Sequence, residues 1–176
     1  MTAPAAPDRS LLQLLGSAAV TVPTHARVLT VPLPDHPIGR PSVVCVIREF
    51  DRSDHAAVAA IWRATGQGVL DEDELRTTLA HGPGLLLVAE QPAGVVGVVL
   101  GTFDGRRGWI HRLAVDPAHR RSGLATALVA EVERRLADRG APRINLLVLP
   151  DNAAGLAFWQ RRGYLPYPDV LCSKAL

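Results

Sequence analysis

The sequence predicts an α/β fold in which one mixed sheet carries helices on both faces. Segments with the period-two hydrophobic pattern of strands alternate with segments of period 3.6, which is typical of helices. Three successive strand-like segments are separated only by short turns. At 176 residues and 48% hydrophobic composition, the chain can bury one substantial core. The expected order of elements is β-α-α-β-β-β-α-β-α-β-β.

The N-terminal part of the chain is expected to be a proline-rich, poorly ordered extension. Seven of the fourteen prolines precede Ser42, where the composition changes abruptly. Within residues 1–42, the pattern indicates only a short helix around 10–15 and an extended piece at 27–33. Residues 43–176 are expected to be the folded domain.

The domain is expected to begin with a strand at 43–50 and two helices. The first helix, at 54–64, has Ser53 as its candidate N-cap. The second covers DEDELRTTL, in which Asp71 and Glu74 have the spacing of a capping box. An antiparallel meander of three strands should follow, at 85–90, 94–103 and 109–115.

A long helix at 123–139 is expected after the meander, because Leu or Val recurs at every fourth position from Leu124 and Gly140 can end it. The remaining expected elements are a strand at 143–149, a helix at 152–162, and two strands at 164–166 and 170–174.

Charge and cysteine content argue against several kinds of site. The formal net charge is +2 and no block of five like charges occurs, so we expect no nucleic-acid partner. Cys45 and Cys172 lie in apolar runs without metal-ligand spacing, which predicts buried, reduced thiols and no metal site. The apolar segment at 11–22 is too short to cross a bilayer and lacks signal-peptide features. We therefore expect a cytoplasmic protein without a membrane partner.

The stretch HRRSGLATAL, at 119–128, opens the long helix directly after a predicted strand. A helix start directs unpaired N–H groups and the positive end of the helix dipole at its surroundings, which suits phosphate. Gly123 would let a ligand approach the backbone, Ser122 and Thr126 offer hydroxyls, and two arginines add charge. GxxxxGK[ST] and GxGxxG are both absent, which excludes a P-loop and the usual dinucleotide fingerprint. A glycine here can also be purely structural.

From LAVDPAHRRSGLATALVAEVERRLADRG through LLVLPDNAAGLAFWQRRGYLPY, the chain resembles the GNAT superfamily of acetyl-CoA-dependent N-acetyltransferases. In that family a Q/R-x-x-G-x-G/A turn is followed by a helix, a strand and an N…A…(F/Y)-x-x-x-G-(F/Y) segment. The resemblance covers roughly residues 44–176. FDGRRGWIHRLAVDPAHRRSG and LPDNAAGLAFWQRRGY look most like the bacterial YpeA-type acetyltransferases. The resemblance implies a GNAT-like sheet and acetyl-CoA as cosubstrate.

The resemblance also implies which residues bind acetyl-CoA. Amides from Arg121 to Thr126 would hold the pyrophosphate, with Arg120 at the family's Gln or Arg position. A bulged strand at 113–115 would pair with the pantetheine arm, and an amide of Ala114 or its neighbour would polarise the thioester carbonyl. The full candidate set is Leu113, Ala114, Val115, Arg120, Arg121, Ser122, Gly123, Leu124, Ala125, Thr126, Asn152 and Trp159.

Acetyl transfer needs a base for the amine and can use an acid for the departing thiolate. Where the family usually has an acidic Tyr, this chain has Trp159, whose indole N–H is no acid at neutral pH. Three alternatives follow: the thiolate leaves unaided, a hydroxyl such as that of Tyr164 or Tyr167 protonates it, or catalysis has been lost.

The candidate base is His111. The family often uses a carboxylate on the strand GWIHRLAV, which here has none. His111 titrates near neutrality and, by simple alternation, shares a strand face with Trp109, Leu113 and Val115. A purely structural histidine is the alternative. Two carboxylates are weaker candidates, Asp104 and Glu72.

Together these features predict an N-acetyltransferase that transfers acetyl from acetyl-CoA to a primary amine of a small molecule or protein. It would act as a monomer or homodimer. The alternative is a catalytically weak or inactive CoA-binding regulatory or interaction domain, which the missing Tyr and carboxylate would favour. A nucleotide-binding protein is a third possibility.

Overall fold

The structure, a computed structural model, describes residues 26–32, 42–168 and 170–174. The chain divides into two compact units, Met1–Asn145 and Leu146–Leu176. In the described part of the chain, none of the helices has the length and apolar character needed to span a bilayer.

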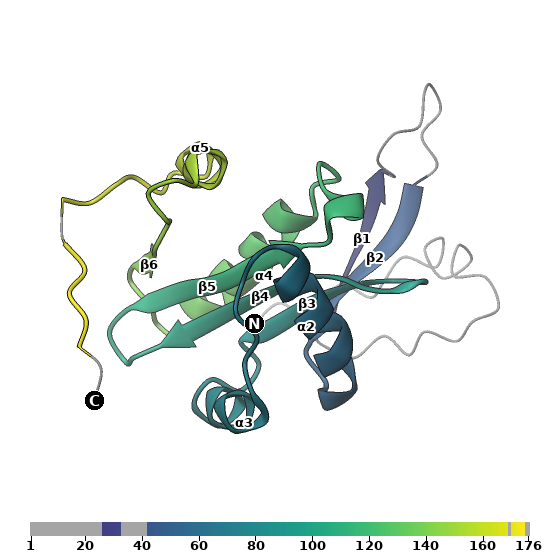
Figure 1. Cartoon of the computed structure of the whole chain (residues 1–176), viewed down its shortest axis with the longest axis horizontal. Coiled ribbons are helices and arrows are strands. Elements are labelled where there is room, and N and C mark those ends of the chain that lie inside the picture. The colour runs from purple at the N-terminus through teal and green to yellow at the C-terminus, as the bar shows by residue number, and fades with distance from the viewer. Residues whose placement is uncertain (1–25, 33–41, 169, 175–176) are drawn as a thin grey trace, which may run out of the picture. The chain divides into compact units, whose positions relative to one another are not determined.

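Six strands form one sheet in the order β1-β2-β3-β4-β5-β6 (Figure 1). They are β1 (Arg27–Pro32), β2 (Ser42–Glu49), β3 (Leu86–Gln91), β4 (Gly94–Phe103), β5 (Gly108–Val115) and β6 (Ile144–Leu146). Each of the first four is antiparallel to the next. Helix α4 (Leu124–Asp138) connects β5 to β6, and a helical crossover of this kind joins parallel neighbours, which makes the sheet mixed.

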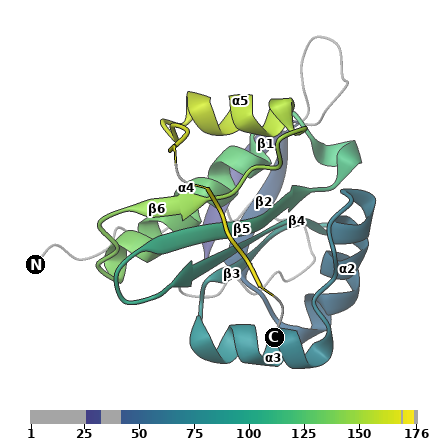
Figure 2. The ribbon, with the colours of Figure 1, turned by 60° about the vertical axis from the view of Figure 1, so that its left-hand side comes forward.

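Helices cover both faces of the sheet in the first unit (Figure 2). On one face lie α2 (His55–Ala64), which continues from the 3₁₀ helix η1 (Arg52–Asp54), and α3 (Glu72–His81). Their apolar side chains pack with strand residues in a core that comprises Val58, Ile61, Trp62, Leu70, Leu75, Leu86, Val88, Val98, Leu100 and Ala114.

Helix α4 lies on the other face and packs closely because strand positions beneath it are glycines. A Cβ added to Gly101 would lie 2.6 Å from Cγ2 of Val132, and one added to Gly97 would lie 3.0 Å from Cδ1 of Leu128. Val132 and Leu128 are fully buried. Glycine at both positions therefore lets the helix approach the sheet.

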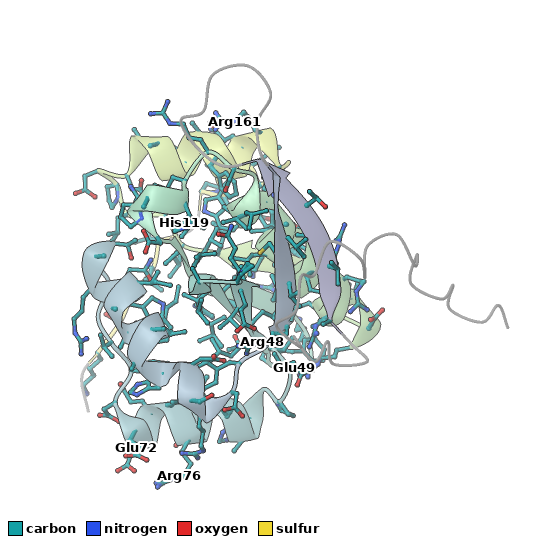
Figure 3. The ribbon with its side chains drawn as sticks, turned by 90° about the vertical axis from the view of Figure 1, so that its right-hand side faces the viewer. Arg48, Glu49, Glu72, Arg76, His119 and Arg161 are labelled. Carbon is teal, nitrogen blue, oxygen red and sulfur yellow. The ribbon has the colours of Figure 1, made fainter. Side chains whose placement is uncertain are left out.

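Two successive residues of β2 connect the sheet to helices on opposite faces, Arg48 and Glu49 (Figure 3). Arg48 donates to Asp54 of η1 with 2.6 Å between Nη1 and Oδ2. Glu49 accepts from Arg135 of α4 with 2.6 Å between Nη1 and Oε1. Hydrogen bonds to Asp54 and Glu90 raise the pKa of Arg48 despite its burial. Because neighbouring strand side chains alternate, β2 is tied to both helical layers.

The extended piece expected at 27–33 is strand β1, which pairs with β2 from Arg27↔Ile47 to Pro32↔Ser42. The prediction of a poorly ordered extension up to residue 42 is therefore wrong for these six residues. The edge of β2 supplies unpaired backbone groups that an extended segment can satisfy. The helix expected around 10–15 lies outside the described residues.

The strands expected at 164–166 and 170–174 are not strands in the structure. Pro166 and Pro168 have no backbone N–H to donate to a ladder, and Leu165 and Val170 are 79% and 84% exposed. The strand expected at 143–149 is shortened to Ile144–Leu146. The second unit contains helix α5 (Ala153–Arg161), close to the expected range.

One predicted helix cap is confirmed and another is wrong. Asp71 and Glu74 form the expected capping box at α3. At η1, however, the cap is Asp51 rather than Ser53, because Asp51 Oδ1 accepts the Ser53 amide at 2.9 Å.

The two cysteines have different environments. Cys45 is buried as expected, and burial, with a smaller contribution from Glu90, raises the pKa of its thiol to about 12. Cys172 is exposed, contrary to expectation, because its segment joins no strand ladder.

Candidate active site

Strand β5 contains a β-bulge opposite β4. The register runs from Val98↔Ala114 to Leu100↔His111, so two residues of β5, Arg112 and Leu113, oppose one residue of β4. Arg112 has a φ of +51°, in the left-handed region. The strand that the family resemblance implied to be bulged is therefore bulged in this chain.

The bulge changes which side chains share a face with His111. Simple alternation predicted Leu113 and Val115, and this is wrong, because the extra residue shifts the alternation by one position. Ala114 instead lies in the core with Leu100, the cross-strand partner of His111. Trp109 does share the face, and its ring stacks on that of His111 with 6.2 Å between centroids.

Long-range contacts fix the bulge to α2 and to the loop that follows α2. Trp62 Nε1 donates to the Arg112 carbonyl at 3.4 Å, and Gln67 Nε2 donates to the Leu113 carbonyl at 3.1 Å. The Arg112 guanidinium donates to the Gly68 carbonyl and lies 5.3 Å from the centroid of the Trp62 ring. These contacts offset the cost of the left-handed conformation at Arg112.

Beyond the bulge, β5 has backbone groups that β4 does not use. The Asp116 amide donates to the Val96 carbonyl at 2.9 Å, so alternation directs the Ala114 amide toward β4 and the Val115 amide toward the opposite edge. On that edge β6 begins beside Gly108 and has only three residues. It therefore ends before Val115, and no described strand covers the edge there.

The turn between β5 and α4 presents backbone amides next to open space. Arg121 and Gly123 have φ values of +59° and +85°. A Cβ on Gly123 would meet no atom within 4 Å, and α4 has no side-chain cap at its N-terminus. The first amides of α4 thus lack intrahelical acceptors at an accessible position, which is the arrangement that binds anions.

The side chains of this turn divide into structural and accessible ones. Ser122 is 6% exposed and donates to the His119 carbonyl at 2.6 Å, so its hydroxyl holds the turn. His119 lies on the short 3₁₀ helix η2 (Pro117–His119), before the turn (Figure 3). Arg120 and Arg121 are exposed.

His111 has a position and protonation state that suit a base. Its Nε2 lies 3.1 Å from the Thr102 hydroxyl oxygen. Burial, and then the positive charge of Arg112, lower the pKa of His111 below its ordinary value of 6.5. The ring is therefore neutral at pH 7, and one ring nitrogen can accept a proton.

The weaker carboxylate candidates have local structural contacts instead. Asp104 accepts the amides of Arg107 and Arg106 at 2.6 and 2.8 Å, and these hydrogen bonds lower the pKa of its carboxyl group and weaken it as a base. Glu72 is exposed at the start of α3, 3.8 Å from Arg52 (Figure 3).

The second unit holds the other candidate residues. Asn152 caps α5, because its Oδ1 accepts the Gly155 amide at 2.8 Å. Trp159 is 8% exposed, and its ring makes edge-to-face contacts with Phe158 and Tyr164, each with 5.1 Å between centroids. Tyr164 therefore lies directly beside the Trp that replaces the family's Tyr.

The side-chain contacts that hold the bulge, made by Trp62, Gln67 and Arg112, were not predicted from the sequence. Gln67 is a single polar residue after a helix and gives no periodic signal, and Arg112 looks like an ordinary strand residue. The segments of Gln67 and Arg112 come into contact only because β5 is bulged.

The comparisons with known proteins agree with this geometry. Residues 48–164 match the Acetyltransferase (GNAT) family. The chain is 38% identical to the acetyltransferase plu1384 of Photorhabdus laumondii, over 67% of this chain and 85% of that protein. It is 34% identical to the acetyltransferase YE1169 of Yersinia enterocolitica, over 74% of this chain and 94% of that protein. The chain therefore belongs to the GNAT acetyltransferase family and is an acyltransferase with acetyl-CoA as its cosubstrate.

Solved structures share the fold at lower identity. Ard1 from Thermoplasma volcanium aligns with a TM-score of 0.64 at 23% identity, over 69% of this chain and 82% of that one. The aminoglycoside 6'-N-acetyltransferase AAC(6')-IG from Acinetobacter haemolyticus aligns with a TM-score of 0.62 at 20% identity, over 74% and 98%. At these identities the likeness concerns the fold.

Proposed function

We propose that this enzyme transfers the acetyl group of acetyl-CoA to a primary amine on a small molecule or protein. The observation that supports it most is the uncapped start of α4, which has open space at Gly123 and follows a bulged strand with a backbone edge that no described strand covers. Relatives named as acetyltransferases make the alternative, a CoA-binding domain without turnover, the weaker reading.

Acetyl-CoA, when bound, supplies a thioester that a neutral amine can attack. The amides from Arg121 to Thr126, with Arg120, would hold the pyrophosphate. The free edge at Val115 would pair with the pantetheine arm. The amide that polarises the thioester carbonyl is then a neighbour of Ala114 rather than Ala114 itself, whose amide points to β4.

In the transfer, the amine nitrogen bonds to the acetyl carbon, the carbon–sulfur bond breaks, and the nitrogen loses a proton. The unprotonated ring nitrogen of His111 would accept that proton. Tyr164 or solvent would protonate the departing thiolate, since Trp159 has no acidic proton.

The test is thiol release from acetyl-CoA across a panel of amines that includes peptides and small polar amines. We expect release that depends on the amine, with the acetylated amine confirmed by mass spectrometry. Tight acetyl-CoA binding without amine-dependent release for any member of the panel would contradict the proposal and support a CoA-binding domain.

A further inference from the structure

A hollow on the first unit is lined by three arginines and a proline, Arg106, Arg107, Arg143 and Pro142. Arg106 and Arg107 belong to the turn before β5, and Pro142 and Arg143 precede β6. The turn between β5 and α4, which is proposed to hold the pyrophosphate, follows the other end of β5, about 23 Å along the strand. The hollow is therefore separate from the proposed pyrophosphate site.

Two of its arginines lie on the same face of the sheet as His111. A Cβ on Gly108 would meet Leu136 of α4 and Ile144, so Gly108 and Ile144 face α4. Alternation then places Arg107, before Gly108, and Arg143, before Ile144, on the opposite face.

Trp109 and His111 continue this face along β5. Thr102 is the cross-strand partner of Trp109, and its hydroxyl oxygen lies 3.1 Å from His111 Nε2. Arg107, Trp109 and His111 therefore form a row on one face, with Arg143 beside its arginine end. From Arg107 to His111 the backbone spans about 13 Å.

The lining of the hollow carries three guanidinium groups. Among the described residues, no carboxylate lines it. Asp104, the acid of the same turn, accepts the amides of Arg106 and Arg107 and the Trp109 indole N–H. Guanidinium groups match carboxylates in bidentate geometry, so several arginines around one hollow favour an acidic ligand.

We propose that this surface selects an acidic polypeptide as the amine acceptor. The inference rests on the proposed function. The acceptor's amine lies at His111, its chain runs over Trp109, and its acidic side chains bind the arginine hollow. An extended chain rises about 3.3 Å per residue, so the acidic side chains belong about four residues from the reacting amine. A free amino acid is too short to reach both points.

The test compares two peptides with a free N-terminal amine, identical except for Glu or Gln at the fourth and fifth positions. We expect the Glu peptide to have a kcat/KM about tenfold higher, and this preference to shrink as salt is raised. Free glutamate should be a poor acceptor.

The variant that carries Arg106→Gln, Arg107→Gln and Arg143→Gln together should lose the preference and keep its activity on the Gln peptide. The backbone bond from the Gly108 amide to the Arg143 carbonyl does not depend on the Arg143 side chain. Arg76→Gln is the matched control, because Arg76 is exposed on α3 (Figure 3).

Equal use of the Glu and Gln peptides by the parent would overturn this inference and leave the proposed function intact, as would free glutamate acting as well as the Glu peptide. If no amine is acetylated, the proposed function fails. Direct measurement of peptide binding then tests whether this surface binds acidic side chains. The parent should then bind an N-terminally blocked Glu peptide about tenfold tighter than the triple variant does. Equal binding by both proteins would overturn the inference.

Discussion

The side-chain amide of Gln67 donates a hydrogen bond to the backbone carbonyl of Leu113, with 3.1 Å between Nε2 and the oxygen. This contact joins the loop after α2 to the bulge in β5. In the opposite direction, the Arg112 guanidinium donates to the Gly68 carbonyl of that loop. The backbone proposed to bind the acetyl group is thus held by a loop that is distant in sequence.

Gln67→Leu should loosen the bulge. We expect a loss on the order of 1 kcal/mol in stability, from one hydrogen bond to a partly buried carbonyl. Misplacement of the bulge should also lower kcat/KM about fivefold. Gln160→Leu, the same change at an exposed position on α5, is the control. A lower melting temperature with unchanged kinetics would limit Gln67 to a structural role.

Gly123→Asp should abolish acetyl-CoA binding, because it brings a negative charge to the amides proposed to hold the pyrophosphate. The φ of +85° also strains any residue with a Cβ, by about 1–2 kcal/mol. Gly140→Asp separates the two effects, because Gly140 has a φ of +84° and equally open surroundings at the other end of α4. Calorimetry should show acetyl-CoA binding only to the Gly140 variant. Unimpaired binding to Gly123→Asp would refute the pyrophosphate site.

His111→Gln should remove the acid limb of the pH–rate profile. Burial and Arg112 lower the pKa of His111 below 6.5, so the proposed base is neutral above that pKa, and activity should fall as the pH drops through it. Kinetics between about pH 5 and 9 should show the limb below 6.5 in the parent. The variant should lose about 10²-fold in rate at pH 7 and keep its acetyl-CoA affinity. A profile of unchanged shape would make His111 structural.

Much of the fold could be predicted because it follows from local signals. The meander, the long helix and its glycine turn each depend on hydrophobic period and on nearby Gly. The bulge could not be predicted, since it depends on the pairing of β4 with β5 and left-handed Arg112 gives no local signal. For the same reason, the role of Gln67 was not predicted, and the predicted face of Leu113 was wrong. Strand β1 was underestimated because its surroundings in sequence are rich in proline, although its partner β2 supplies the ladder.

Deletion of residues 1–32 should destabilise the protein, because it removes β1 and exposes the edge of β2. Six cross-strand pairs are lost, and at a few tenths of a kcal/mol or more each we expect a fall in melting temperature of about 5–10 °C, with aggregation. Deletion of residues 1–25 keeps β1 and is the comparison. Equal melting temperatures for the two truncated proteins would show that β1 adds no stability.

Trp159 is the clearest departure from the family pattern, and two substitutions test its role. Trp159→Phe should retain most activity if the thiolate leaves unaided, because both rings bury apolar area against Phe158 and Tyr164. Trp159→Tyr restores the family's phenol and should raise kcat if protonation of the thiolate limits the rate. The smaller ring leaves a void, so we expect a gain well below the 10²-fold typical of general acids. Steady-state kcat with a saturating amine measures both effects, and melting temperatures measure the stability that the void costs. An inactive Phe variant together with a Tyr variant that gains nothing would instead assign the indole a positioning role in the second unit.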